Sequence, residues 1–279
     1  MSPAGQTTRP RKNVSGLWPN SLAILKEPTT SRAILLYIYR AVTAPILLLT
    51  TALAPSASAF AGGHRAAAPV RPLTYVAIGA SDAYGVGADD PASESWPAVL
   101  DAMLPRGSRL VNLGVPGITL ARALDIELPV ALDALPGRCA ARKNSGCAGS
   151  RSVVTVWLAV NDLRAGASLR SYGANLHTLL RALRLRTGAA VLVGNVPDLA
   201  ALPSFRGQGP ALAATVAAWN KAIAATAHQD GATLVDLYAG WRELAAHPEY
   251  VGADGLHPTA AGYRRLAEIF YRGLEGLGR

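Results

Sequence analysis

Cysteine and long apolar runs are scarce in this chain of 279 residues, and both absences limit its class. The chain has only two cysteines, and neither a histidine nor a second cysteine pair lies near them, so that region makes a poor metal site. A clean apolar stretch of about 20 residues, the length that a membrane-spanning helix needs, is missing. Half of the residues are nevertheless hydrophobic, which is enough to bury a sizeable core.

Acidic residues are also few, which gives the chain a formal charge of +9 at pH 7. The first 59 residues hold six basic residues and a single acidic one. Beyond them no basic run is longer than a pair, and few aromatic side chains are interleaved with the charges. Because nucleic-acid surfaces combine clustered Lys and Arg with stacking aromatic rings, we expect no nucleic-acid partner.

Residues 1–61 have the composition of a targeting segment. Basic residues precede a short apolar stretch, residues 41–54, and small residues follow it with A-x-A sites that end at Ala59 and Ala61. These are the parts of a secretory signal peptide. The stretch before the apolar core is longer than usual, so either the true start lies downstream or the segment stays as a membrane anchor. We expect a secreted or extracytoplasmic protein, cleaved near Ala59 or Ala61, with an uncleaved N-terminal anchor as the alternative.

The two cysteines, Cys139 and Cys147, lie in one polar stretch with the composition of a loop. In an oxidising compartment they can approach each other without straining a helix or a strand, and we expect them to form a disulfide. The alternative is a pair of free thiols.

Short apolar runs alternate with helical patterns after a Gly/Ala/Pro-rich linker at residues 62–71. The apolar runs predict five strands, at residues 73–79, 109–114, 152–160, 189–196 and 232–238. Helices are predicted at residues 95–105, 119–135, 168–188, 211–231 and 259–277, the second of them broken at Pro129. Uniformly apolar strands separated by helices are typical of a parallel sheet covered on both faces. We therefore predict one α/β domain over residues 72–279, a three-layer α/β/α sandwich with a five-stranded parallel sheet.

Polar residues suited to acyl transfer follow four of the predicted strands. Ser81 follows the first strand, Gly114 ends the second, and Asn161 follows the third; Asp254 and His257 come after the fifth, just before the last helix. Parallel sheets place their sites at the carboxyl ends of strands. Each residue alone has an ordinary interpretation as a cap, a turn or a loop residue. Together they supply a nucleophile, a base, a carboxylate to orient the base, and donors for an oxyanion.

The stretches GASDAYGVG, NLGVPG, AVND and DGLHPTAAGY resemble the signature blocks of the SGNH, or GDSL-type, hydrolase superfamily of esterases and lipases. They span most of the predicted domain, and the last block is the most specific. The resemblance implies a flavodoxin-like fold, with Ser81 as nucleophile, His257 as general base and Asp254 as the residue that orients His257. It also implies an oxyanion hole made of the Ser81 and Gly114 backbone N–H groups and the Asn161 side chain.

Two positions depart from the superfamily pattern. Ala80 stands where an Asp usually precedes the serine, and Ala159 stands where a Gly usually lies two residues before the Asn. Neither position transfers the proton, so we expect activity to survive. Asp82, directly after the serine, is a candidate to replace part of the lost hydrogen bonding.

Two competing assignments fit less well. The GASDA stretch matches two of the three fixed positions of the G-x-S-x-G elbow of α/β-hydrolases. In that fold, however, strands precede the elbow, and the acid normally lies on a different loop from the histidine. The other histidines lack both a carboxylate at this spacing and a place at a strand end; they are His64, His177, His228 and His247.

The leading hypothesis is an exported serine hydrolase that cleaves carboxylic esters through an acyl-enzyme, without a metal or organic cofactor. The alternatives are a membrane-anchored O-acyltransferase on the same fold and a non-catalytic domain that binds glycan or lipid. The expected substrate is a small-molecule, lipid or glycan ester, and membrane contact is expected only through an uncleaved N-terminal segment. The stretch Val196–Gln208 is a candidate lining of an acyl pocket, with a packed loop as the alternative, and Trp157 and Trp219 are assigned to the core.

Overall fold

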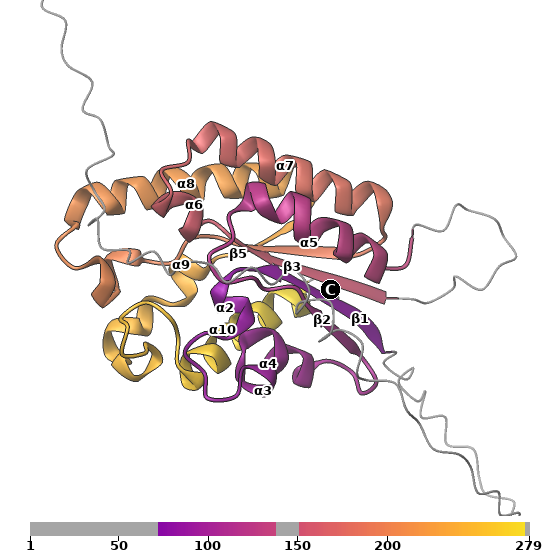
Figure 1. Cartoon of the computed structure of the whole chain (residues 1–279), viewed down its shortest axis with the longest axis horizontal. Helices are drawn as coiled ribbons and strands as arrows, with labels where there is room; N and C mark the ends of the chain where they lie inside the picture. The colour runs from indigo at the N-terminus through magenta and orange to yellow at the C-terminus, as the bar shows by residue number, and fades with distance from the viewer. Residues whose placement is uncertain (1–71, 138–150, 277–279) are drawn as a thin grey trace, which may run out of the picture. The chain divides into compact units, whose positions relative to one another are not determined.

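Five parallel strands form the middle layer of the structure, a computed structural model that describes residues 72–137 and 151–276 (Figure 1). The sheet has the order β2-β1-β3-β4-β5, and every neighbouring pair is parallel. The strands are β1 (Leu73–Gly79), β2 (Arg109–Asn112), β3 (Arg151–Trp157), β4 (Ala190–Gly194) and β5 (Thr233–Val235). The predicted signal or anchor segment, the linker and the pair Cys139 and Cys147 lie outside the described residues.

Helices cover both faces of the sheet, as Figure 1 shows. One face carries α5 (Leu120–Ala134), α7 (Leu169–Arg186) and α8 (Gly209–Gln229), and the other carries α3 (Pro91–Glu94), α4 (Trp96–Met103) and α10 (Ala260–Glu275). Shorter elements follow the strands: α2 (Ser81–Tyr84), α6 (Val160–Arg164), α9 (Leu237–Gly240) and 3-10 turns at Leu199–Ala201, Pro203–Phe205, Arg242–Ala246 and Pro248–Tyr250. The predicted three-layer α/β/α class is confirmed. None of the described helices has both the length and the apolar character that crossing a membrane requires.

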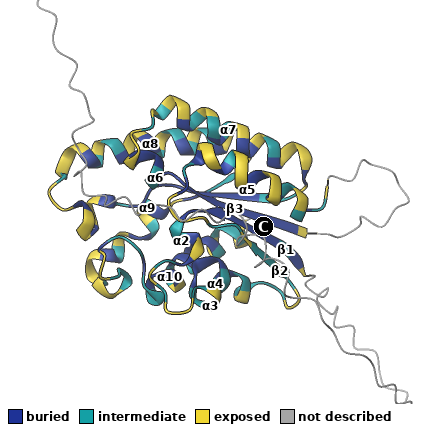
Figure 2. Ribbon diagram, in the orientation of Figure 1, coloured by how far each residue is buried: buried dark blue, intermediate teal, exposed yellow. Residues whose placement is uncertain are grey.

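The helices bury one face each and expose the other (Figure 2). On α7 the buried residues recur at helical spacing; they are Tyr172, Leu176, Leu179, Leu180 and Leu183. The arginines of the same helix point to solvent. Trp219 of α8 packs against Tyr172 with ring centroids 4.6 Å apart, so its assignment to the core is confirmed.

An aromatic cluster fills the opposite layer beneath the end of β3. The rings of Trp96 and Phe270, from α4 and α10, stack at 4.3 Å between centroids, and Trp157 meets Trp96 edge-on at 6.2 Å. Such pairs contribute about 0.5–1.5 kcal/mol each beyond their buried area. The cluster therefore fixes the end of β3 against the two helices of this layer.

Several details of the predicted elements are wrong: the second strand ends at Asn112 instead of residue 114, and the fifth ends at Val235 instead of residue 238, because α9 begins at Leu237. Pro129 does not break the second helix, because α5 runs unbroken over 15 residues. The proline removes one helical hydrogen bond, a local loss that the buried contacts of its neighbours Leu128 and Ala131 offset. The third strand stops at Trp157 instead of residue 160, because the chain turns at Ala159 to begin α6.

The strand order determines where a site can form. From β1 the chain crosses to β2 on one side, and then returns to β3 on the other side of β1. In open parallel sheets, ligands bind at such a reversal, beyond the carboxyl ends of the two strands that flank it. The residues that follow β1 and β3, Ser81 and Asn161, therefore come to lie at one edge of the sheet.

Candidate active site

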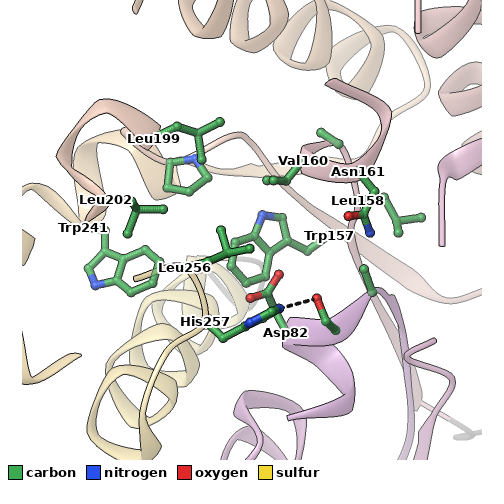
Figure 3. Close-up of a pocket in the computed structure, with 14 residues that line it drawn as sticks. Asp82, Trp157, Leu158, Val160, Asn161, Leu199, Leu202, Trp241, Leu256 and His257 are labelled. Carbon is green, nitrogen blue, oxygen red and sulfur yellow. Dashed lines mark hydrogen bonds between the residues drawn. The ribbon is translucent and has the colours of Figure 1, made fainter. Parts of the chain in front are cut away.

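Ser81, His257 and Asp254 form one continuous chain of hydrogen bonds. The Ser81 Oγ lies 2.9 Å from the His257 Nε2, and the His257 Nδ1 lies 2.5 Å from the Asp254 Oδ2. The serine and the histidine are 176 positions apart in the sequence, so only the fold brings them into contact. Figure 3 shows this contact as the dashed line from His257. The structure thus joins the three residues that the sequence motifs singled out.

Ser81 begins α2, a helix of four residues that starts almost directly after β1. The tight transition needs glycine on both sides. A Cβ on Gly79 would lie 2.6 Å from the Ala83 Cβ, and Gly85 ends the helix with a φ of 99°, a left-handed conformation that favours glycine. The glycines therefore let the strand turn sharply and present Ser81 at the sheet edge.

Asp254 and His257 are held in one tight loop before α10. The Asp254 Oδ1 accepts hydrogen bonds from the Leu256 and His257 N–H groups at 2.9 and 3.0 Å, which leaves Oδ2 for the imidazole. Gly255 provides the turn with a φ of 71°, and the Ser204 hydroxyl donates to the Asp254 carbonyl at 2.8 Å. The carboxylate thus orders its own loop as well as the imidazole.

The environment of Asp254 keeps its carboxyl ionised. Burial raises the pKa of Asp254, but hydrogen bonds from the His257 side chain and from two backbone N–H groups outweigh burial and hold the pKa below its ordinary value. The His257 side chain is only 16% exposed and the Asp254 side chain is 49% exposed. An ionised carboxylate in this position orients the imidazole and stabilises its protonated form.

Asn161 lies beside the pocket, with one amide hydrogen already engaged. Its Nδ2 donates to the Ile118 carbonyl at 2.9 Å, which leaves the second Nδ2–H for a ligand. The turn that aims Asn161 passes through Ala159, whose φ of 153° is the one positive value at a non-glycine residue in the described ranges. Such a conformation costs on the order of 1–3 kcal/mol. The alanine in place of the usual glycine therefore stores strain next to the site.

The Gly114 N–H, predicted as an oxyanion donor, is already occupied. It donates to the Asn112 Oδ1 at 3.1 Å, and the Asn112 amide in turn donates to the Ala83 carbonyl at 2.6 Å. The steric environment explains the glycine instead, because a Cβ on Gly114 would lie 2.4 Å from the Tyr84 backbone N. Gly114 therefore lets the loop after β2 pack on the backbone of α2, and its N–H is not available to a substrate in this arrangement.

A second glycine of the same loop has an unpaired N–H. Gly117 has a φ of 79° and follows Pro116 in a turn closed by a hydrogen bond from the Ile118 N–H to the Val115 carbonyl. Within residues 72–137 and 151–276 the Gly117 N–H donates no hydrogen bond. Because the Ile118 carbonyl binds Asn161, this turn lies beside the Asn161 amide. The sequence alone could not show which of the two glycines has a free N–H, because this difference depends on their hydrogen bonds in the folded structure.

A pocket opens beside the Ser81–His257 contact (Figure 3). Its apolar walls come from the end of β3, from the turns after β4 and from the segments around α9 and His257; they are Trp157, Leu158, Val160, Pro197, Leu199, Leu202, Trp241 and Leu256. The prediction that the stretch Val196–Gln208 lines the pocket is therefore confirmed for three of its residues. Trp157 both belongs to the core and forms part of the pocket wall.

Asp82 is the one acidic residue that lines this pocket in the described part of the chain. Its carboxylate points into the space beside Trp157 and His257 (Figure 3) and accepts no hydrogen bond from another described residue. Burial raises the pKa of Asp82 to about 6, although the nearby His257 lowers it. The sequence led us to expect that Asp82 replaces part of the hydrogen bonding lost at Ala80. In the described structure it does not, because its carboxylate accepts no hydrogen bond from another residue.

Glu127 instead supports the turn that presents Ser81, and the motifs gave no sign of it. It is 1% exposed on α5, and its Oε1 accepts the Gly79 N–H at 3.1 Å. Its Oε2 has no hydrogen-bond partner among the described residues. Burial raises the pKa of Glu127 to about 8, against the effect of the Gly79 hydrogen bond. The sequence contained one sign that Glu127 is buried. It lies four residues from Ala123 and four from Ala131, on the apolar face of the helix.

Asp162 also anchors the site from a buried position. Its Oδ2 accepts the N–H of Leu120, the first residue of α5, at 2.9 Å, and the residue is 2% exposed. Burial raises its pKa, while this hydrogen bond lowers it. The two residues of the Asn-Asp pair after β3 thus have different roles. Asn161 lines the pocket, whereas Asp162 connects the turn to α5 by a hydrogen bond.

The other described histidines have different environments. His177 pairs with Asp230 at 2.9 Å, and His247 pairs with Glu249 at 2.8 Å. Neither of them lines the pocket. Across residues 72–137 and 151–276, no group of three or more His, Cys, Asp or Glu side chains is arranged to hold a metal ion.

The chain matches a protein-family model over the range that holds this geometry. The model of a family described as "GDSL-like Lipase/Acylhydrolase family" matches residues 77–265. This range begins in β1, ends in α10, and contains every residue of the hydrogen-bonded set described above. None of the curated proteins compared with the chain matches it.

Solved structures share the fold. The crystal structure of TesA is 26% identical, with a TM-score of 0.57, over 73% of this chain and 99% of TesA. LAE5, an alpha/beta hydrolase enzyme from the metagenome of Lake Arreo, Spain, is 18% identical, with a TM-score of 0.57, over 75% of this chain and 98% of its own. An Axe2 variant, an acetyl xylan esterase from Geobacillus stearothermophilus, is 18% identical, with a TM-score of 0.54, over 72% and 94% of the two chains.

Replacing Glu127 by Gln should flatten the pH dependence of stability. The folded protein binds this proton up to about pH 8, whereas the free carboxyl releases it near 4.5. The free energy of unfolding of the parent protein should therefore fall as the pH rises through this window, by at most about 1.4 kcal/mol per unit of pKa difference. Glutamine keeps an oxygen for the Gly79 N–H but has no charge to bury. Urea unfolding at about pH 5 and about pH 9 measures the difference, and an unchanged slope in Glu127→Gln would contradict it.

Replacing Ala159 by Gly should cost no stability, although the change removes a buried methyl group. Relief of the strained φ, worth on the order of 1–3 kcal/mol, should offset the lost burial and the greater entropy of the unfolded glycine. The matched control is Ala123→Gly in α5, a buried alanine in regular helix that should lose about 1–2 kcal/mol. Urea unfolding compares the two variants. Equal losses would show that Ala159 stores no strain.

Proposed function

The chain belongs to the GDSL-like lipase/acylhydrolase family, and from this we propose that it is an exported serine hydrolase that cleaves carboxylic esters through an acyl-enzyme. One observation carries the proposal: the unbroken chain of hydrogen bonds from Ser81 Oγ through His257 to Asp254. This order of groups is what an activated hydroxyl nucleophile requires. Esterase activity in the Axe2 relative is in keeping with it, as a property of that protein.

In the proposed reaction Ser81 Oγ attacks the ester carbonyl carbon while its proton passes to His257 Nε2. The proton on Nδ1 stays hydrogen-bonded to Asp254, which stabilises the imidazolium. The tetrahedral intermediate then expels the alcohol, which takes the proton from Nε2 and leaves the acyl group on Ser81. Water enters, gives a proton to His257 and attacks the acyl carbon, and the second collapse releases the acid and restores the Ser81 hydroxyl.

We assign the oxyanion hole to the Ser81 N–H, the free Nδ2–H of Asn161 and the Gly117 N–H. The Asn161 amide has one hydrogen left after its bond to the Ile118 carbonyl. The Gly117 N–H is unpaired in the described structure, whereas the Gly114 N–H is bound to Asn112. Three donors around one oxygen stabilise the charge that develops in both tetrahedral steps.

Residues 1–61 are proposed to direct export, as a signal peptide cleaved near Ala59 or Ala61. The proposal rests on three features of the sequence: basic residues before the apolar core, the apolar core itself, and the small residues that follow it. In an oxidising compartment Cys139 and Cys147 would pair. An O-acyltransferase held by an uncleaved anchor would use the same residues, with an alcohol in place of water in the second step.

Ser81→Ala should lose hydrolysis of p-nitrophenyl butyrate by about 10⁴-fold or more in kcat, because no other hydroxyl of the described residues binds the His257 Nε2. His257→Ala should lose a similar factor, and Asn161→Ala about 10²–10³-fold, the usual effect of one oxyanion donor. The measurement is the initial rate of p-nitrophenol release by residues 60–279. The thermal unfolding of each variant serves as the control for folding. A folded Ser81→Ala protein that keeps the parent rate would refute the assigned nucleophile.

Expression of the whole chain in a secreting host should yield a soluble product in the medium that begins at residue 60 or 62. Sequencing of its N-terminus locates the cleavage, and resistance of both cysteines to alkylation before reduction tests the disulfide. The same preparation with an added alcohol separates hydrolysis from transfer. An intact N-terminus in the membrane fraction, with acyl transfer faster than hydrolysis, would favour the anchored transferase.

A further inference from the structure

A single carboxylate interrupts the apolar lining of the pocket. Asp82 directly follows Ser81, and its side chain points into the pocket beside Trp157 and His257 (Figure 3). Within the described residues its oxygens accept no hydrogen bond from any other residue. Glu127 and Asp162, the other two acids buried around this site, each accept a backbone N–H. Asp82 is therefore the one acid of the three whose carboxylate is bound by no other described residue, since its one hydrogen bond comes from its own backbone N–H.

Few charged groups of the described structure lie near Asp82. No Lys or Arg lines the pocket in the described chain. The titratable neighbours that act on Asp82 are His257, which attracts its negative charge, and Asp254, which repels it. A carboxylate that is partly removed from water and bound by no other residue is costly to ionise, and an opposite charge nearby offsets the cost. The natural place for that opposite charge is the ligand.

The walls of the pocket that Asp82 lines suit a particular kind of cation. Two indole rings, those of Trp157 and Trp241, line the pocket together with Leu199, Leu202 and other apolar side chains. Aromatic rings attract ammonium groups, and quaternary ammonium ligands are commonly held by aromatic walls. A carboxylate among aromatic and aliphatic walls thus matches an ammonium group with alkyl substituents better than it matches a neutral chain or an anion.

We propose that Asp82 makes this pocket selective for esters that carry an ammonium group a few bonds from the scissile carbonyl. The inference rests on the proposed ester hydrolysis, since Asp82 lines the same pocket as Ser81 and His257. The adjacent position in the chain keeps the carboxylate close to the nucleophile, so the ammonium and the carbonyl must be joined by a short linker. Esters with a carboxylate in that position are repelled by the same group.

The test uses substrate pairs that differ only in charge. Butyrylcholine and 3,3-dimethylbutyl butyrate have the same shape, with the charge on the alcohol side; ethyl 6-aminohexanoate and ethyl heptanoate place it on the acyl side. At about pH 8 the Asp82 carboxyl, with its pKa of about 6, is ionised. The quantity measured is the ratio of kcat/KM for the charged member to that for the neutral member. A general change in activity cancels in this ratio.

For at least one pair, Asp82→Asn should lower the ratio on the order of tenfold, because the variant keeps the shape of the side chain and removes its charge. Asp89→Asn is the matched control, since Asp89 is exposed, lies outside the pocket lining and carries the same charge. Its ratio should equal that of the parent protein. Asp82→Ser provides a second variant if Asp82→Asn does not fold, as judged by circular dichroism.

Binding of tetramethylammonium, followed by NMR titration of the parent protein and of Asp82→Asn, separates this inference from the proposed function. If the esters are hydrolysed and both proteins give the same ratio, the selectivity is refuted and the hydrolase remains. If no ester is hydrolysed but tetramethylammonium binds the parent protein and not the variant, the cation site stands and ester hydrolysis fails. If no ester is hydrolysed and tetramethylammonium binds both proteins alike or neither, the cation site is refuted.

Discussion

The close packing of α2 against the backbones of two glycines is the constraint on which the rest of the site depends. Gly79 at the end of β1 and Gly114 after β2 approach this four-residue helix from two sides, closer than any Cβ would allow. The Tyr263 hydroxyl of α10 then donates to the Val86 carbonyl just beyond α2, which ties the helix after His257 to the same turn. The Ser81–His257 contact can stay at 2.9 Å because both residues belong to segments packed against one another.

Four carboxyl groups at the site have different roles, which depend on their burial and on the groups that donate hydrogen bonds to them. Glu127 and Asp162 accept backbone N–H groups and so hold the end of β1 and the start of α5. Asp254 is more exposed and is held ionised by hydrogen bonds, the state in which a carboxylate can stabilise an imidazolium. Asp82 faces the pocket, and its carboxylate accepts no hydrogen bond from any other described residue. Four acids of similar intrinsic pKa thus differ in function because their burial and their donors differ.

Much of the fold and the hydrogen-bonded set could be predicted from short patterns. Apolar runs rich in β-branched residues marked the five strands, and strand-end polar residues marked Ser81, Asn161 and the loop that holds Asp254 and His257. Local signals failed where a distant contact decides. Pro129 stays inside α5 because the helix packs on the sheet, and Gly114 serves by its lack of a side chain while Asn112 occupies its N–H.

By itself the sequence determined the order of elements and the parallel class of the sheet, and it singled out the residues that the structure joins by hydrogen bonds, because hydrophobic periodicity and motif spacing are properties of neighbouring residues. Only the tertiary structure decided which of the described N–H groups are free, that Glu127 binds the end of β1 just before Ser81, and that Asp82 faces an apolar pocket. The physical reason is that burial and hydrogen bonding depend on segments far apart in the chain, such as β1, α5 and the loop before α10, whose meeting no local pattern records.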